Sequence, residues 1–420
     1  MADPSILFLI TNSFPLGTGE EFIVNEIEHL SSSFRRVIVV ATQVRSGDIP
    51  TRPIPGNVEV ITVGGPRPTG RHAMRSAIRG LGRLPRQSWN REVLADPRRL
   101  GLEAMFEDHA RDIEASLLAR LPALDLHPGS RAVIYSYWFL DTARVAMLLA
   151  GDLNARGVTV HRLVSRAHGY DLYPERSAYG YLPERPLLLG AFDAVCPVSD
   201  QGARALRRAW PQFADRIVTQ HLGTTDPKGM AECRRKPFHI ISCAYLVSVK
   251  RMTRMPAILA ELRRRGVDAR WTHIGDGPQS ETVREAVRAN GVTDQVTLVG
   301  NVPHHSILQL ERELHPSCLI NLSSSEGLPV SMMEAASLGI PIVASDVGGV
   351  AEIVTDRVNG RLIEPDFTDD RAVDALQWLA GESDESYQAA CQASRQIWES
   401  GYDQAVVYPR FCLDVLGATP

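Results

Sequence analysis

Lysine is scarce in this chain: Lys228, Lys236 and Lys250 are the only lysines among 45 basic residues. A coding bias towards arginine explains the scarcity, yet a lysine kept in such a chain is a candidate for a specific role. A strong excess of one charge is also missing, because the net charge is −4. General nucleic-acid binders are usually basic overall, so we expect no nucleic-acid partner.

Cysteine pairs and long apolar runs are absent as well. Six scattered cysteines without a CxxC pair exclude a disulfide scaffold or a zinc ribbon and suit a reducing compartment. The apolar runs fall far short of the ~18 residues that a membrane span needs. The N-terminal stretch has no basic region of the kind that opens a secretory signal, so we expect a cytoplasmic protein.

Short β-branched runs alternate with helical patterns, which predicts βαβ units and parallel sheets, an α/β fold. The expected strands form two series, at 6–11, 37–42, 58–63, 133–137, 158–164 and 194–198, and at 239–246, 270–274, 296–298, 318–322 and 340–344. Two series in 420 residues predict two Rossmann-like domains. The polar segment 223–237 is the expected linker. The tail from residue 398 is amphipathic, and Pro409 argues against one continuous helix there.

Residues 66–100 depart from this background, with nine arginines against two acids. Arg71, Arg75 and Arg79 are four residues apart and so share a helix face. An apolar stripe beside them consists of Met74, Ala77, Ile78 and Leu81. Such a helix suits peripheral contact with the inner face of an anionic membrane or with an acidic acceptor, and a solvated face on a surface insertion is the alternative.

The most informative stretch is 321–354, NLSSSEGLPVSMMEAASLGIPIVASDVGGVAEIV. A helix should begin near Pro329, just beyond the carboxyl end of a predicted strand, and end at Gly339. Its N-terminus is a site for anions. Glu326 precedes the helix and Glu334 lies within it, and ionised carboxylates accept hydrogen bonds from hydroxyl groups. A nucleotide sugar satisfies both requirements.

This block resembles the donor-site signature of family 4 retaining glycosyltransferases, which belong to the glycosyl transferases group 1 and have the GT-B fold. The resemblance rests on Glu326-x7-Glu334, on the Gly-Ile-Pro-Ile-Val run at 339–343, and on 346–352. It implies two Rossmann-like domains with a cleft between them. Residues 1–225 would then bind the acceptor, residues 226–397 would bind the nucleotide sugar, and the helical tail 398–420 would pack back on the N-terminal domain.

The same family has matching segments in the N-terminal half. A loop with Gly17 and Gly19 follows the first strand, where the family approaches the donor diphosphate or the acceptor, although the pair alone also fits a plain turn. His168, Gly169 and Asp171 resemble the active-site segment whose histidine contacts the donor sugar. The segment with Tyr137 and Trp138 resembles polysaccharide-assembling members, and these rings are candidates for acceptor binding or for the core.

In the second half, the resemblance gives Lys250 the task of neutralising the donor diphosphate. The family's arginine about five residues earlier falls near Tyr245, which has no positive charge, so Arg251 or Arg254 is a candidate replacement. The remaining donor-binding candidates are Gly327, Leu328, Pro329, Val330 and, in the loop expected to line the base, Val302.

Together these residues imply a retaining, metal-independent hexosyl- or N-acetylhexosaminyltransferase with no cofactor beyond its donor. His168, Glu326 and Lys250 are the expected catalytic residues. UDP is the expected nucleotide, with GDP as the alternative. The acceptor would be a glycan, a lipid-linked glycan or a small molecule, in exopolysaccharide or natural-product biosynthesis. A GT-B nucleotide-sugar epimerase and a non-catalytic sugar-binding subunit are the competing interpretations.

Overall fold

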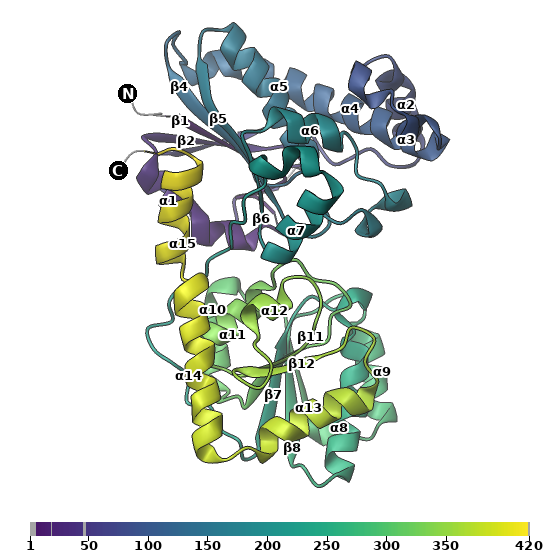
Figure 1. The fold of residues 1–420 in the computed structure, drawn as a ribbon, viewed down its shortest axis with the longest axis vertical. Helices are drawn as coiled ribbons and strands as arrows, with labels where there is room; N and C mark the ends of the chain where they lie inside the picture. The colour runs from purple at the N-terminus through teal and green to yellow at the C-terminus, as the bar shows by residue number, and fades with distance from the viewer. Residues whose placement is uncertain (1–5, 18, 45–47, 419–420) are drawn as a thin grey trace. The chain divides into compact units, whose positions relative to one another are not determined.

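The computed structural model describes residues 6–17, 19–44 and 48–418, so Thr18 of the glycine-bearing loop and the ends of the expected domain ranges lie outside it. The chain divides into two compact units (Figure 1). The first contains residues up to Gln220 together with those from Tyr408 onward, and the second is His221–Val407. The sequence placed the corresponding boundaries at 225/226 and 397/398. Segment 223–237, the expected linker, is part of the second unit.

The first unit contains a six-stranded, all-parallel sheet in the order β3-β2-β1-β4-β5-β6. Its strands are β1 (Ile6–Thr11), β2 (Arg36–Ala41), β3 (Val58–Thr62), β4 (Arg131–Ser136), β5 (Thr159–Ala167) and β6 (Ala194–Pro197). Its helices are α1 (Val24–Ser33), α2 (Gly70–Leu81), α3 (Arg91–Leu94), α4 (Pro97–Leu118), α5 (Asp141–Ala155), α6 (Arg185–Ala191) and α7 (Asp200–Ala209). All six expected strands are confirmed within a few residues.

Burial explains why β1 is a continuous apolar run rather than an alternating one. Its side chains point to both faces in turn, and both faces are covered. Phe8 joins a core that includes α4 and α5, whereas Leu7 and Leu9 join a core that includes α1 and the C-terminal tail. The sheet is therefore doubly wound, as the two-domain expectation requires.

The second unit repeats this topology, with the all-parallel strand order β12-β11-β10-β7-β8-β9. Its strands are β7 (Phe238–Cys243), β8 (Ala269–Ile274), β9 (Val296–Gly300), β10 (Cys318–Asn321), β11 (Ile342–Ser345) and β12 (Gly360–Ile363). Its helices are α8 (Met255–Arg264), α9 (Ser280–Ala289), α10 (His304–Glu313), α11 (Val330–Ser337), α12 (Val350–Ile353), α13 (Asp369–Gly381) and α14 (Asp384–Gly401). The sequence did not predict β12, an edge strand of four residues.

The tail is broken, as Pro409 led us to expect, but the break lies earlier than that residue. Helix α14 ends at Gly401, and α15 (Gln404–Arg410) contains Pro409 before a π-helical turn at Phe411–Val415. Phe411 lies 5.2 Å from the Tyr135 ring, centroid to centroid, within the first unit. The last part of the tail thus completes the core of the N-terminal sheet.

None of the helices in the described part of the chain combines the length and the apolar character required to cross a bilayer.

Candidate active site

Each sheet has one topological switch point, where the order of the strands along the chain reverses. Open parallel sheets bind ligands in the crevice at this point, at the carboxyl ends of the strands. In the first unit it lies between β1 and β4, and in the second between β7 and β10. The predicted site residues come from loops at these carboxyl edges. Gly17 and Gly19 follow β1, Tyr137 and Trp138 follow β4, and Lys250 follows β7.

Lys250 and Glu326 meet at the switch point of the second unit. The Lys250 ammonium Nζ lies 2.7 Å from Glu326 Oε1, which also accepts a hydrogen bond of 3.1 Å from the Asn321 amide. Glu326 is buried, and burial works to raise the pKa of its carboxyl, but the charge of Lys250 and hydrogen bonds from Lys250, Ser323 and Asn321 outweigh this and lower the pKa. The carboxylate is therefore ionised and oriented, and a cation lies beside it.

Two glycine turns hold these loops in place by close backbone approach. Gly275 follows β8 with φ of 130°, and a Cβ there would lie 2.1 Å from the Ala244 carbonyl in the Lys250 loop. Gly348, with φ of 58°, would place a Cβ 2.1 Å from the Glu326 carbonyl. Both positions therefore require glycine on steric grounds as well as on conformational ones. Gly275 and Gly348 thus support the loops that carry Lys250 and Glu326.

Helix α11 begins at Val330, directly after Pro329, and Gly339 follows its end with φ of 72°, as the sequence predicted. Glu334 is buried in this helix and accepts a contact of 2.8 Å from His304 Nε2 at the start of α10. Val302 lies two residues before His304 and is half-buried. Gly327, Leu328, Pro329 and Val330 form the approach to α11, whose first N–H groups have no acceptor within the helix.

The structure gives the candidate replacements for the missing arginine other partners. Arg251 donates to the carbonyls of Leu322, Ser323 and Pro365, at 2.6, 2.8 and 2.9 Å. Arg254 donates to Asp369 Oδ1 and to the Phe367 carbonyl. Both guanidinium groups therefore fasten loops together. Tyr245, at the family's arginine position, is 59% exposed.

In the first unit, the carboxylate of Glu20 organises the glycine-bearing loop. Glu20 is buried and accepts the backbone N–H groups of Asn12, Ser13 and Phe14, at 3.0, 2.7 and 2.6 Å. It also accepts the Trp138 indole N–H at 2.6 Å. A cavity of about 560 Å³ opens beside it, lined by Asn12, Ser13, Gly17, Gly19, Glu20, Gln43, Asp48, Trp138 and Tyr170. Gly17 and Gly19 both have positive φ, so they form a turn that other residues rarely adopt.

His168 lies behind this cavity in an aromatic cage of Phe22, Tyr137 and Trp138, with ring centroids 5.9, 5.1 and 4.3 Å away. Neither ring nitrogen has a hydrogen-bond partner among the described residues, and its Nδ1 is 3.7 Å from Asp171 Oδ2. The His168 ring is thus held by packing against these three aromatic rings, and both of its nitrogens are buried.

Asp171 and Tyr137 are both buried within the first unit. Asp171 is buried and accepts the N–H groups of Phe139 and His168, at 2.8 and 2.7 Å. Burial works to raise its pKa, but the His168 side chain and these N–H groups lower it below the ordinary value. Tyr137 is fully buried and stacked on Phe22, so its ring face is covered, whereas Trp138 lines the cavity.

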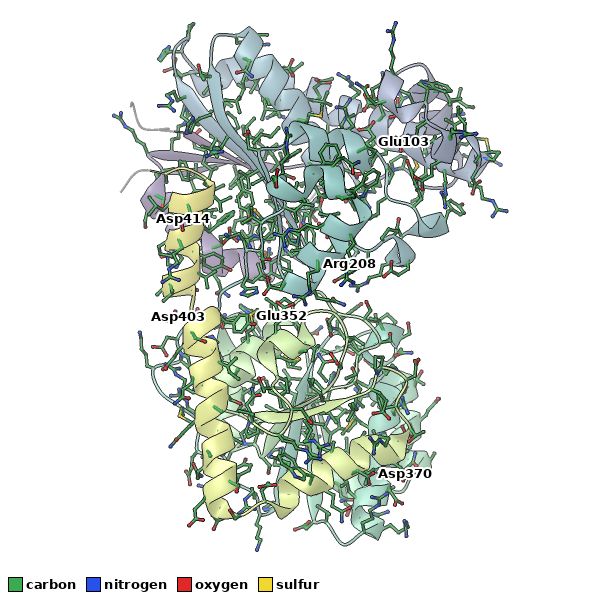
Figure 2. The ribbon with its side chains drawn as sticks, viewed as in Figure 1. Glu103, Arg208, Glu352, Asp370, Asp403 and Asp414 are labelled. Carbon is green, nitrogen blue, oxygen red and sulfur yellow. The ribbon has the colours of Figure 1, made fainter. Side chains whose placement is uncertain are left out.

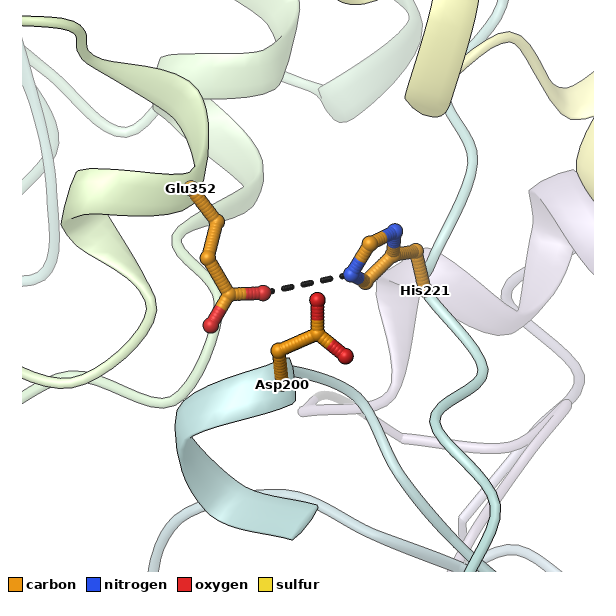
Figure 3. A group of neighbouring side chains, drawn as sticks. All are labelled: Asp200, His221 and Glu352. Carbon is orange, nitrogen blue, oxygen red and sulfur yellow. Dashed lines mark hydrogen bonds and ion pairs between the residues drawn. The ribbon is translucent and has the colours of Figure 1, made fainter. Parts of the chain in front are cut away.

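Glu352, the last residue of segment 346–352, contacts other residues of the second unit. Figure 3 shows its Oε2 beside His221 Nε2, at 3.2 Å. Its carbonyl accepts the Tyr402 hydroxyl at 2.8 Å. Glu352 therefore ties the start and the end of the second unit to α12.

Three residues that contact the predicted site were not singled out from the sequence: Glu20, Asn321 and His304. Each acts on another site residue rather than standing in a motif of its own. The loop position of Glu20, eight residues after Asn12, gives no periodic signal. His304 is the exception that could have been found, because it closely follows Val302 in the loop expected to line the base.

The two doubly wound units define the chain as a two-domain α/β protein of the GT-B type. Residues 231–396 match the family described as "Glycosyl transferases group 1". The resemblance carried by the motifs is thus confirmed over residues 231–396, which are similar to that family.

Several known proteins are similar over longer stretches. WcaL of Escherichia coli K12, named for colanic acid biosynthesis, is 27% identical over 226 residues, which are 52% of this chain and 55% of WcaL. The chain thus spans about half the length of this curated relative. The GDP-mannose-dependent alpha-(1-6)-phosphatidylinositol monomannoside mannosyltransferase of Mycobacterium tuberculosis is 24% identical over 352 residues, 76% of this chain and 87% of that protein.

A solved structure shares the fold across almost the whole chain. Anabaena Alr3699/HepE in complex with UDP superposes with a TM-score of 0.64 at 15% identity, covering 98% of this chain and 99% of that one. At this level of identity the match establishes the fold alone.

Proposed function

We propose that the protein is a retaining glycosyltransferase that moves a hexosyl or N-acetylhexosaminyl group from a nucleotide-diphosphate sugar to an acceptor hydroxyl. The observation that carries this proposal is the Lys250–Glu326 pair at the switch point of the second unit, 2.7 Å apart and next to the N-terminus of α11. The cation suits the diphosphate, the helix terminus adds positive potential, and the carboxylate accepts sugar hydroxyls. Glu334, with His304, is suited to the ribose.

Lys250 is also placed to stabilise the leaving group, since negative charge grows on the diphosphate as the glycosidic bond breaks. The acceptor hydroxyl attacks on the same face, and a donor phosphate oxygen takes its proton. His168, whose Nδ1 lies 3.7 Å from the Asp171 carboxylate, would contact the donor sugar, as the family resemblance implies. This scheme needs no metal ion, and transfer insensitive to EDTA is its expected signature.

UDP is the proposed nucleotide, with support from the shared fold of HepE, which was solved with UDP. A relative named for GDP-mannose makes GDP the alternative to test. The acceptor is a glycan, a lipid-linked glycan or a small molecule, in exopolysaccharide or natural-product biosynthesis, bound by the first unit. We place the enzyme in the cytoplasm, at the inner face of the membrane.

The decisive experiment uses radiolabelled UDP- and GDP-sugars and follows transfer and slow hydrolysis. Lys250→Ala and Glu326→Ala should each lower turnover at least ~100-fold, about 2.7 kcal/mol of barrier. Lys228→Ala is the matched control, because Lys228 is exposed and pairs only with Asp226 among the described residues. Wild-type turnover in both site variants would contradict the assignment. Stereochemical exchange without transfer would define an epimerase, and binding without turnover a sugar-binding subunit.

A further inference from the structure

Helix α2 packs with its small residues inward and its large apolar residues outward. Ser76 and Gly80 are buried, whereas Met74 is 68% exposed and Ile78 is 66% exposed. Leu81 is 39% exposed on the same side, since these three residues are spaced by three or four. Helices of water-soluble domains normally turn such residues towards the core. The exposed stripe therefore needs an explanation outside the unit.

The rotation of α2 about its axis is fixed by its contact with α4. A Cβ on Gly80 would lie 1.8 Å from the Ala104 carbonyl, so the two helices touch through backbone. Arg79 and Arg83 form ion pairs with both Asp108 and Asp112 of α4, at 2.7–3.0 Å. The outward position of Met74 and Ile78 is thus built into the packing. Arg79, which the sequence grouped with Arg71 and Arg75, belongs to the inner contact.

The outward face also carries positive charge. Arg71 and Arg75 are exposed beside Met74 and Ile78, and neither forms an ion pair within the described ranges of the chain. The connected segment continues the pattern, with Trp89 46% exposed and Leu94 of α3 55% exposed. Figure 1 shows α2 and α3 together beside α4 in the first unit. Exposed rings and aliphatic chains between arginines match an interfacial membrane surface.

Three cavities of the first unit, between α2 and the glycine-bearing loop, have lining residues in common. The cavity beside Arg75 is also lined by Pro68 and His109. These two residues line a second, more apolar cavity of about 280 Å³, which reaches Tyr170. Tyr170 in turn lines the cavity with Gly17 and Gly19.

We propose that the outer face of α2, with Trp89 and Leu94, docks on an anionic phospholipid bilayer. The arginines supply attraction to the lipid phosphates, and the apolar side chains enter the acyl boundary. A second copy of the chain fits this face less well, because a two-fold contact would oppose Arg71 and Arg75 to identical charges. The docking does not depend on the donor chemistry proposed above.

Co-sedimentation of the full chain with extruded vesicles tests the proposal. We expect binding to vesicles of phosphatidylcholine and phosphatidylglycerol, and little binding to phosphatidylcholine alone. Arg71→Gln/Arg75→Gln should lower partitioning about tenfold and remove most of its salt dependence. Met74→Asp/Ile78→Asp should abolish it, while the matched control Val358→Asp/Leu413→Asp, at two residues about half exposed, should bind like the wild type.

Brominated phospholipids provide a second measurement. They should quench tryptophan fluorescence in the wild type, and Trp89→Phe should lose most of the quenching while still sedimenting with vesicles. Unchanged binding of Met74→Asp/Ile78→Asp, or equal binding to neutral vesicles, would overturn the proposal. Loss of a dimer in light scattering for that variant, without vesicle binding by the wild type, would instead make the face a contact between copies.

Discussion

At the scale of single residues, the first unit contains a buried carboxylate cluster outside the candidate site. Arg144 of α5 lies 2.7 Å from Glu107 and 2.9 Å from Glu184, and all three side chains are buried. Glu103, labelled in Figure 2, accepts the Tyr181 hydroxyl at 2.8 Å nearby. Arg144 and Arg111, which also binds Glu107 at 2.8 Å, cannot neutralise all three acids, so the cluster has to hold a proton.

Burial raises the pKa of Glu184 to about 9, against the opposing charge of Arg144 and with a further increase from Glu107 and Glu103. The pKa of Glu107 is lowered: burial works to raise it, but the hydrogen bonds and charges of Arg144 and Arg111 outweigh burial. Glu184 thus keeps its proton in the folded state at pH 7, whereas the unfolded chain loses it above the ordinary glutamate pKa of 4.5. Folded-state stability then falls as pH rises from that value towards 9.

Glu184→Gln removes this titration while keeping the size of the side chain. The melting temperature of the variant should therefore gain on the wild type as pH rises from 5 to 8, by about 8–16 °C, because the shift is equivalent to about 4 kcal/mol over that range. Scanning fluorimetry across pH measures the difference. Glu107→Gln is the opposite control, because it removes the ionised partner of Arg144 and should lower the melting temperature at neutral pH. Parallel pH profiles for wild type and Glu184→Gln would contradict the argument.

At the scale of elements, the contact between α2 and α4 depends on Gly80, near the C-terminal end of α2. Gly80→Ala places a methyl group against the Ala104 carbonyl, so the helices must separate. We expect a loss of about 1–3 kcal/mol in the free energy of unfolding. Gly101→Ala, in α4, is the matched control: a Cβ there meets nothing within 4 Å, and the helix gains about 0.5–1 kcal/mol.

Urea denaturation of both variants, followed by circular dichroism, measures the two changes. An equal response of the two glycines would mean that close packing at Gly80 does not hold α2 in place. The same comparison bears on vesicle binding, because a displaced α2 should also lose the orientation of its outer face.

Elements were the level at which sequence was most informative, and the reasons are local. Short continuous apolar runs such as 6–11, which contain β-branched residues, favour strands covered on both faces, and Pro329 and Gly339 mark the two ends of α11. The edge strand β12 has no such run. The outward face of α2 was also beyond reach, because periodicity gives the stripe but not the side that packs. That side was decided by Gly80 and by acids thirty residues away.

The candidate site shows the same division. Glu326, Glu334 and Lys250 were found because they stand in recognisable spacing. Their partners Asn321 and His304 were not, because a contact within a loop or between two helices leaves no trace in spacing. Arg251 shows the converse. Its positive charge, next to Lys250 in the sequence, made it a candidate replacement for the family's arginine, yet its guanidinium bonds to three backbone carbonyls.

At the scale of the whole molecule, the chain returns to its first unit through Phe411. This ring is fully buried, lies over the Arg166 guanidinium at 4.5 Å, and covers Tyr135. Arg166 is itself buried and bonds to Glu26 at 3.0 Å and to Tyr135 at 2.6 Å. Phe411 thus covers a buried ion pair, and each unit has a hydrophobic core of its own.

Separate cores predict two calorimetric transitions, which respond to different changes. Phe411→Ala should destabilise only the first unit. Its free energy of unfolding should fall by about 3–5 kcal/mol, because the substitution removes a buried ring. Leu413→Ala, at a half-exposed position two residues later, is the control and should change neither. UDP should stabilise only the second unit, because Lys250, Glu334 and the N-terminus of α11 lie there. At 100 times its dissociation constant it should add about 2.7 kcal/mol to the free energy of unfolding of that unit. Differential scanning calorimetry resolves these shifts, and a UDP effect on the transition that Phe411→Ala lowers would move the nucleotide site to the first unit.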